Sequence, residues 1–189
     1  MKKFLMAVAA MFTMATAANA ATSGIQDVQP KGGFNLGLML GVPPVGGDWD
    51  ANMPMISVDG NWTVASGLFN AGKFGQNGAI DLGFYYGVCH YENHYWEDAG
   101  LLQNSINFRS AFHFEFVPKL DVYGGMFGGV NIWSPTGDSE WDTDVKGCFG
   151  LKLGGKYYFT DVFGVKLEFA HDFIEDNIPG VAGGVSFKF

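Results

Sequence analysis

Apolar and polar residues alternate along most of this chain, and this alternation limits its fold more than any other feature. Every second residue from Phe34 to Val42 is apolar, and the same alternation recurs in residues 106–116 and 165–169. A period of two is that of a β-strand with two different faces, whereas an amphipathic helix repeats every ~3.6 residues. After residue 20 no apolar run reaches the ~18 residues that a membrane-spanning helix needs. The chain is therefore predicted to fold as strands.

Eight alternating segments can be counted, and the connectors between them differ in length. Two tight turns, at 117–119 and 159–161, alternate with long polar connectors, while the Gly- and Asn-rich connector 65–78 is longer than a tight turn. Short turns at one rim and long loops at the other are typical of outer-membrane barrels. The long connectors are 43–53, 91–104, 133–144 and 172–178. The predicted strands are 33–42, 54–64, 79–90, 105–116, 120–132, 146–159, 163–171 and 180–189.

The size of the apolar side chains indicates which face of the barrel meets lipid. The apolar face is crowded with Phe, Leu and Trp62, which are too bulky for the small interior that eight strands enclose. The opposite face combines glycine with charged residues and suits a narrow polar interior. We therefore expect an all-β fold, an eight-stranded antiparallel up-and-down transmembrane β-barrel with its apolar face toward lipid. The alternative is a soluble barrel or sandwich whose apolar face points inward.

The first twenty residues have the pattern of a secretory signal peptide. Two lysines precede the apolar run 4–18, and Ala18-Asn19-Ala20 supplies the small residues of a cleavage site. The alternative is a membrane anchor, for which the apolar run is short. Removing these residues takes away two lysines and no acid, so the formal charge changes from -8 to -10. The predicted organisation is a signal peptide at 1–20, a short periplasmic segment at 21–31 and the barrel at 32–189.

Two strand–turn–strand stretches carry a resemblance to a known family. They are FHFEFVPKLDVYGGMFGGVN (112–131) and LGGKYYFTDVFGVKLEF (153–169), supported by PMISVDGNW and the closing GVSFKF. With these stretches the chain resembles the small outer-membrane β-barrel proteins of Gram-negative bacteria, the porin-family or OmpX/OmpW-like barrels. The resemblance implies eight strands, periplasmic termini, surface loops and a location in the outer membrane of a Gram-negative bacterium. It supplies no catalytic residue.

The C-terminal residues match the signal that the outer-membrane assembly machinery reads in such proteins. The signal consists of a glycine, then an aromatic residue, then a terminal aromatic residue. In this chain these are Gly184, Phe187 and Phe189. Ala182 stands where a polar residue is usual. The resemblance therefore implies the assembly machinery as a partner. The alternative is an ordinary core strand that happens to end the chain.

Charged residues of both signs share the inward face of the predicted strands. Five acids and five bases balance there, and buried charges are tolerable only when they are paired. This balance favours a salt-bridged plug in the lumen, and the alternative is a narrow wet pore lined by the same charges. The predicted lumen charge network consists of Asp59, Asp81, Arg109, Glu115, Asp121, Lys152, Lys156, Lys166, Glu168 and Lys188.

Catalytic side chains are hard to assemble from this sequence. Some barrels of this size are lipid-modifying enzymes that use serine, histidine and an acid, but no serine here has a histidine at a suggestive spacing. His171 and Asp172 are neighbours, and neighbours in a strand point to opposite faces. We therefore expect no enzyme, no catalytic residue and no cofactor.

Cys89 and Cys148 are the only cysteines. Their predicted strands lie across the barrel from each other, whereas a disulfide needs Cα atoms within about 7 Å. Two free, buried thiols are therefore favoured over a disulfide. The chain lacks the Cys and His spacings of a zinc site.

The long connectors contain twelve acids and no Lys or Arg, together with Trp49, Trp96, Trp133 and Trp141. Alternating carboxylates in DSEWDTD suggest weak binding of Ca²⁺ or Mg²⁺, although the glycine and the closing glutamate of a calcium loop are missing. The alternative is a solvated acidic loop that only repels anions. The candidate metal ligands are Asp138, Glu140, Asp142 and Asp144.

The expected function is a structural or adhesive role in which the acidic, Trp-containing extracellular loops contact a surface. The alternative is a narrow channel for small, mostly apolar solutes, and a lipid-modifying enzyme comes third. Expected partners are outer-membrane lipid and lipopolysaccharide, and an external protein or surface ligand. An acidic chain without basic clusters argues against nucleic acid as a partner. We expect a monomer.

Overall fold

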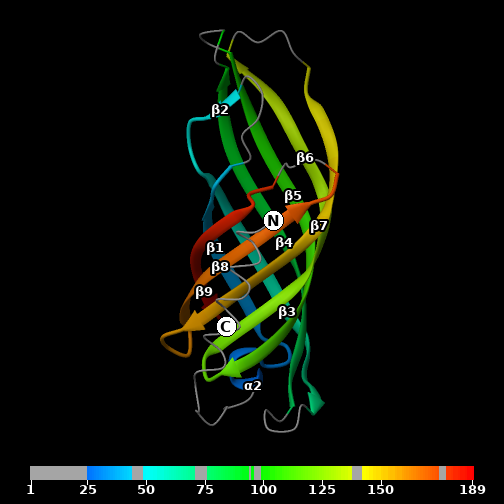
Figure 1. Cartoon of the computed structure of the whole chain (residues 1–189), viewed down its shortest axis with the longest axis vertical. Helices are drawn as coiled ribbons and strands as arrows, with labels where there is room; N and C mark the ends of the chain where they lie inside the picture. The colour runs from blue at the N-terminus through cyan, green and yellow to red at the C-terminus, as the bar shows by residue number, and fades with distance from the viewer. Residues whose placement is uncertain are drawn as a thin grey trace, which may run out of the picture.

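The structure, a computed structural model, describes residues 25–43, 49–70, 76–93, 95, 99–137, 142–174 and 178–189. Eight strands form one antiparallel ring in the order β1-β3-β4-β5-β6-β7-β8-β9, and β9 pairs with β1 to close it (Figure 1). The prediction of an all-β, eight-stranded antiparallel barrel is confirmed. The elements are α2 (Ile25–Val28), β1 (Phe34–Gly41), β2 (Trp49–Ala51), β3 (Met55–Asn70), β4 (Gln76–Asn93), β5 (Ala99–Val117), β6 (Leu120–Gly137), β7 (Asp144–Tyr158), β8 (Phe163–Asp172) and β9 (Val181–Lys188).

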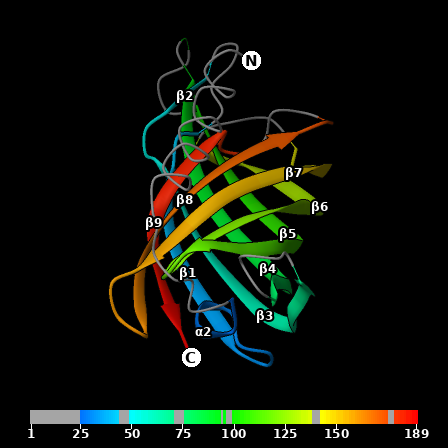
Figure 2. The same ribbon diagram turned by 60° about the horizontal axis from the view of Figure 1, so that its bottom comes forward.

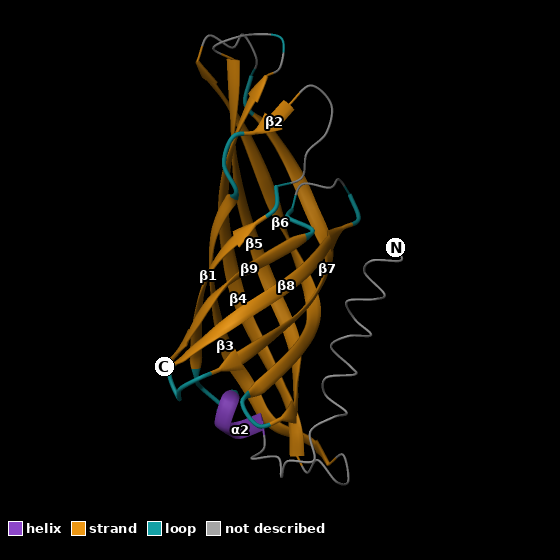
Figure 3. Ribbon diagram, turned by 60° about the vertical axis from the view of Figure 1, so that its left-hand side comes forward, coloured by secondary structure: helices purple, strands orange, loops and turns teal. Residues whose placement is uncertain are grey.

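The two ends of the barrel differ. One end carries α2, the C-terminus and the two short turns, and we call it the turn end; the long connectors lie at the opposite end, the loop end (Figures 1 and 3). None of the helical residues that the structure describes belongs to a helix with the length and apolar character needed to cross a membrane. The predicted signal peptide at 1–20 lies outside the described residues.

The wall of the barrel is tall on one side and low on the other. Strands β3 to β6 are 16–19 residues long, whereas β1, β8 and β9 have only 8–10 residues. The tall side continues past the low side at the loop end, where β2 pairs with β4 (Figure 3). Each predicted segment overlaps one strand of the ring, but β2 was not predicted and the four long strands extend into the predicted connectors 65–78, 91–104 and 133–144.

The two faces of the wall have opposite chemistry. Outward side chains such as Leu38, Trp62 and Phe108 are large, apolar and exposed, while the inward charged side chains are buried. An exposed apolar band around a closed barrel is the surface that such barrels present to lipid. Aromatic rings gather at the turn end of this band, where Phe163 and Phe187 lie 5.6 Å apart between ring centres. Aromatic girdles of this kind sit at membrane–water interfaces.

Steric packing shows that side chains fill the lumen. A Cβ added at inward Gly37 would overlap the carboxylate of Asp59, and one added at Gly154 would overlap the ring of Tyr123. Several outward glycines differ, since a Cβ at Gly124 would make only ordinary contact, 3.5 Å from a methyl carbon of the neighbouring strand, although one at outward Gly60 would overlap the Phe84 ring. Inward glycines therefore leave room for side chains from neighbouring strands, as expected where an eight-stranded interior is just wide enough to be filled.

Candidate functional site

A cross-lumen charge network occupies the middle of the barrel. Arg109 on β5 lies 2.6 Å from Glu168 on β8, between Nη1 and Oε1, and both side chains are buried. The hydroxyl of Tyr123 on β6 donates to the other Glu168 oxygen at 2.9 Å. Lys166 donates to Asp59 Oδ1 on β3 at 2.8 Å and lies 3.4 Å from Glu168 Oε2. These contacts connect four strands through the centre of the lumen.

Aromatic rings add to the same network. The guanidinium carbon of Arg109 lies 3.8 Å from the ring centre of Tyr85 on β4 and 5.9 Å from that of Phe127 on β6. A cation over an aromatic face is stabilised most when water is excluded. Arg109 is therefore held by one carboxylate and two rings, and a hydrated path through this level of the lumen would have to displace it.

A second charge cluster lies nearer the turn end. His113 on β5 lies between two carboxylates, with Nε2 2.8 Å from Asp81 Oδ2 and Nδ1 2.8 Å from Asp121 Oδ1. Lys156 Nζ is 3.9 Å from the second oxygen of Asp121. A carboxylate accepts hydrogen bonds but does not donate them, so Nδ1 donates to Asp121, while Nε2 approaches Asp81 at ion-pair distance. A histidine engaged on both sides in this way is not available as a general base for a nucleophile.

The turn end of the lumen is closed by α2 and the residue that follows it (Figure 2). Ile25 and Val28 of α2 are buried against Ala79 and Tyr158. Gln29 is buried completely and forms hydrogen bonds with interior side chains. The predicted periplasmic segment 21–31 is described from residue 25 onward, and three of its residues lie inside the barrel.

Apolar clusters and a chain of buried polar side chains, Gln103, Ser105 and Asn131, occupy the lumen toward the loop end. Met55, Cys89 and Tyr91 are buried inside the tall wall, with Trp133 packed against them. On the low side, Ile178 after β8 is buried in a second apolar cluster. That cluster contains Phe127 and Cys148.

Both cysteines are free and buried, so the interpretation of two free thiols is confirmed. Cys89 lies on β4 and Cys148 on β7, which are not neighbours in the ring. The thiol of Cys89 donates to the carbonyl oxygen of Met53 at 3.3 Å, and that of Cys148 donates to the Asn107 amide oxygen at 2.7 Å.

The structure places nine of the ten predicted lumen charges in buried positions, and Lys188 is half-buried at the turn end. Lys188 Nζ lies 5.3 Å from the ring centre of Tyr158, and Lys152 Nζ lies 5.4 Å from that of Tyr123. Glu115 differs from the others because its Oε1 accepts the backbone N–H of Lys119 at 3.0 Å and so holds the β5–β6 turn. The buried set is Asp59, Asp81, Arg109, Glu115, Asp121, Lys152, Lys156, Lys166 and Glu168.

The predicted lumen charge network left out several interior residues, among them His113 and Gln29. His113 shares the inward face of its strand with Arg109 and Glu115, so its strand position was a usable signal. Gln29 precedes the first strand, and no periodic pattern marks it as an interior residue. A four-residue helix is too short for sequence periodicity to reveal which face it buries.

The structure describes only two of the four predicted metal ligands. Asp138 and Glu140 lie outside the described residues. Asp142 and Asp144 are exposed, and Asp144 lies 3.8 Å from Lys146 Nζ. In the part of the chain that the structure describes, no group of three or more His, Cys, Asp or Glu side chains could hold a metal ion. Weak binding of Ca²⁺ or Mg²⁺ by this loop stays a prediction.

The predicted assembly-signal residues lie at the seam of the barrel. Gly184 on β9 pairs with Met39 of β1, and Phe187 pairs with Leu36. Phe189 is 70% exposed, and its backbone N–H donates to the carbonyl oxygen of Phe34 at 2.8 Å. The role of Gly184, Phe187 and Phe189 in assembly stays a prediction.

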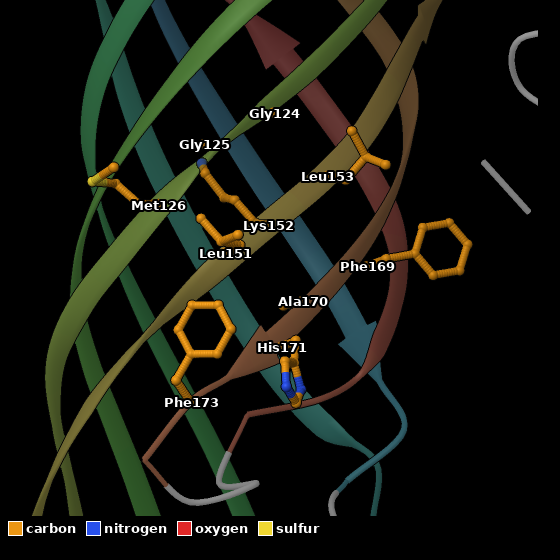
Figure 4. A pocket seen from close by; sticks show the side chains of 10 residues that line it. All are labelled: Gly124, Gly125, Met126, Leu151, Lys152, Leu153, Phe169, Ala170, His171 and Phe173. Atoms are coloured by element: carbon orange, nitrogen blue, oxygen red, sulfur yellow. The ribbon is translucent and has the colours of Figure 1, made fainter. Parts of the chain in front are cut away.

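A groove of about 460 Å³ indents the outer face of β6, β7 and β8. Outward side chains line it, among them Met126, Leu151, Phe169 and His171 (Figure 4). The backbone pairing of β6 with β7 and of β7 with β8 is continuous beneath it. Most of the lining is outward and apolar, and the buried lumen residue Lys152 also contributes to it.

Solved structures with the same fold come from outer-membrane proteins of Gram-negative bacteria. Ail, the attachment invasion locus protein of Yersinia pestis, is similar with a TM-score of 0.55 and 11% identity, over 84% of this chain and 99% of Ail. The structure of Ail in complex with the heparin analogue sucrose octasulfate gives a TM-score of 0.50 and 10% sequence identity, over 84% of this chain and 99% of Ail. The outer membrane protein OprG of Pseudomonas aeruginosa is similar with a TM-score of 0.51 and 11% sequence identity, over 85% of this chain and 97% of OprG.

No protein-family model matches the chain, and no curated protein matches it in sequence. The likeness to Ail and OprG therefore rests on the three-dimensional structure. It shows that the chain has the fold of the small eight-stranded outer-membrane β-barrels of Gram-negative bacteria.

Proposed function

We propose that this protein is a non-conducting outer-membrane barrel that acts through its loop end as a structural or adhesive surface. The observation that carries the proposal is the cross-lumen charge network around Glu168, which joins β3, β5, β6 and β8 through the middle of the lumen. Removing one partner of a buried ion pair costs about 3–5 kcal/mol, because the other charge stays buried without compensation, so the paired charges favour a filled lumen.

The shape of the loop end supports a role in surface contact. At the loop end the tall wall consists of β4 to β6 with β2 beside β4, and it raises one side of the barrel above the other (Figure 3). Strand β3 begins at Met55, opposite Gly41 of β1, so its extra length lies at the turn end. Exposed acids on this side include Asp50, Glu92, Asp142 and Asp144. The tall wall therefore offers an acidic surface that stands clear of the apolar band.

Charge favours one class of partner for this surface. Ail has been solved with a sulfated sugar, a polyanion. The long connectors of this chain contain twelve acids and no Lys or Arg, so they repel polyanions. We expect the loop end to bind a basic protein surface, or an anionic surface such as lipopolysaccharide only when Ca²⁺ or Mg²⁺ bridges the two.

The alternative, a narrow channel for small apolar solutes, receives less support from the structure. Charged or aromatic side chains fill the interior at mid-height, and the backbone pairing of β6, β7 and β8 is continuous beneath the outer groove. The third interpretation, a lipid-modifying enzyme, would need a histidine free to act as a base. His113 is engaged by two carboxylates and His90 Nε2 lies 3.0 Å from Thr136 Oγ1.

Binding of the refolded barrel in nanodiscs to charged surfaces tests the adhesive role. We expect binding to immobilised poly-lysine that weakens as salt is raised, and no binding to immobilised heparin without divalent cations. The matched control carries Asp50→Asn, Glu92→Gln, Asp142→Asn and Asp144→Asn, which remove charge from exposed positions only. Equal binding of both barrels to poly-lysine, or wild-type binding to heparin in chelator, would contradict the proposal.

A further inference from the structure

We infer that residues Ile25–Gln29 are a built-in peptide ligand, seated in a polar binding site at the turn end of the lumen. The site takes an apolar helical turn followed by a primary carboxamide. It is independent of the partner that binds at the loop end.

The carboxamide of Gln29 makes three short contacts with polar groups inside the barrel, and its Nε2 also lies 3.5 Å from His113 Nδ1. Its Nε2 donates to Asp121 Oδ2 at 2.7 Å. Its Oε1 accepts from Asn35 Nδ2 at 3.0 Å and from Thr63 Oγ1 at 2.8 Å. Four hydrogen bonds are the most that a glutamine side chain can make, so the site satisfies most of this group while excluding it from water.

These hydrogen bonds select a carboxamide over its closest relatives. A glutamate at this position has no donor for Asp121 and would place a third carboxylate beside Asp121 and Asp81, which both face His113. A leucine would leave the polar atoms of Asn35 and Asp121 without this partner in a buried place. Of these three side chains, only glutamine provides both a donor for Asp121 and an acceptor for Asn35 and Thr63.

The helical turn before Gln29 contributes an apolar anchor. Ile25 and Val28 are buried against Ala79 of β4 and Tyr158 of β7. The backbone N–H of Gln29 donates to the carbonyl oxygen of Ile25 at 2.6 Å, which closes the turn. Burial of two branched apolar side chains stabilises the seated segment. The segment thus binds with an apolar and a polar half.

A tight turn returns the chain from this site to the wall. Gly32 has a φ of 81°, in the left-handed region where a residue with a side chain would be strained. Its N–H donates to the Thr63 carbonyl oxygen at 2.8 Å, and the Thr63 N–H donates to Gly33 at 3.0 Å. The turn therefore fastens the segment to β3 directly below the carboxamide site.

Hydrogen exchange in the full-length refolded barrel tests whether the segment is seated. We expect the amides of residues 25–29 to exchange slowly in the wild type, and Gln29→Glu to speed their exchange about tenfold or more, the equivalent of ~1.4 kcal/mol. Exposed Lys31→Gln is the matched control, because it lies two residues further on and should change nothing. Wild-type exchange as fast as that of a free peptide would overturn the inference.

Rebinding in trans separates a ligand from a merely structural tail. The variant with residues 21–29 deleted should bind a synthetic peptide of residues 21–30, measured by calorimetry in detergent. The same peptide with glutamate in place of Gln29 should bind at least about tenfold more weakly. Equal binding of both peptides, or no binding by a deletion variant that is folded by its heat-modified gel mobility, would contradict the proposed site. If the deletion variant does not fold, the exchange experiment decides alone.

Discussion

At the scale of single residues, Glu168 is the carboxylate that joins the most strands of the cross-lumen charge network. It faces Arg109, Tyr123 and Lys166, which come from β5, β6 and β8. Two buried cations stabilise the carboxylate between them. If the carboxylate is neutralised, the cations stay buried without a compensating negative charge. The cost of changing it is therefore set by the charges that stay behind.

Glu168→Gln keeps the shape of the side chain but removes its charge. We expect the free energy of unfolding in urea and detergent micelles to fall by about 3–5 kcal/mol, because Arg109 and Lys166 stay buried with too little negative charge. Asp144→Asn is the control at an exposed position, where an ion pair contributes less than about 1 kcal/mol. Equal losses in the two variants would show that the lumen charges do not stabilise one another.

Glycine positions give a second comparison between the two faces. Gly154→Ala points its methyl group into the Tyr123 ring, and we expect a loss of about 1–3 kcal/mol from overpacking. Gly124→Ala points outward with room for the methyl group, so we expect no loss or a gain of up to ~1 kcal/mol. Thermal unfolding followed by gel mobility measures both. A larger loss at Gly124 would mean that the inward and outward faces are assigned wrongly.

At the scale of elements, strand alternation predicted all eight strands of the ring but not their lengths. Alternation arises where one face meets lipid and the other packs inside, so it is strong from Phe34 to Gly41. Beyond the apolar band, backbone pairing continues without that pattern, as between Glu92 and Gly100. The ends of β3 to β6 and the short β2 could not be predicted for this reason.

For the candidate site too, strand alternation predicted some features and not others. The sequence was sufficient to predict which charged residues lie on the inward face, because successive residues of a strand point to opposite faces. Their pairing could not be predicted, since Arg109 and Glu168 meet across the lumen and are 59 positions apart. Gln29 lies outside any strand, so only the fold reveals that it enters the barrel.

The seam between β9 and β1 is an element-scale feature that a deletion can test. Phe189 exchanges two backbone hydrogen bonds with Phe34, at 2.8 and 3.0 Å, and their ring centres lie 6.4 Å apart. We expect deletion of Phe189 to leave export intact but to reduce the folded, heat-modifiable barrel in the outer membrane, because the last pairing that closes the ring is lost. Normal amounts of folded barrel would contradict the predicted assembly role.

At the scale of the whole molecule, the barrel has a closed interior and an asymmetric outer end. The cross-lumen charge network fills its middle, α2 with Gln29 fills the turn end, and apolar clusters with buried polar side chains occupy the loop end. The acidic tall wall is then the part of the molecule with room to contact a partner. In this account the lumen side chains stabilise the barrel, and the loop end contacts the partner.

Single-channel recording tests the closed lumen most directly. The refolded protein is inserted into planar lipid bilayers, and its folded state is checked by heat-modified gel mobility before the recording. We predict no unitary current steps at any applied voltage that the bilayer withstands, since Arg109 and Glu168 occupy the centre of the lumen. Reproducible steps from the wild-type barrel that persist after repurification would show a conducting pore and contradict the account.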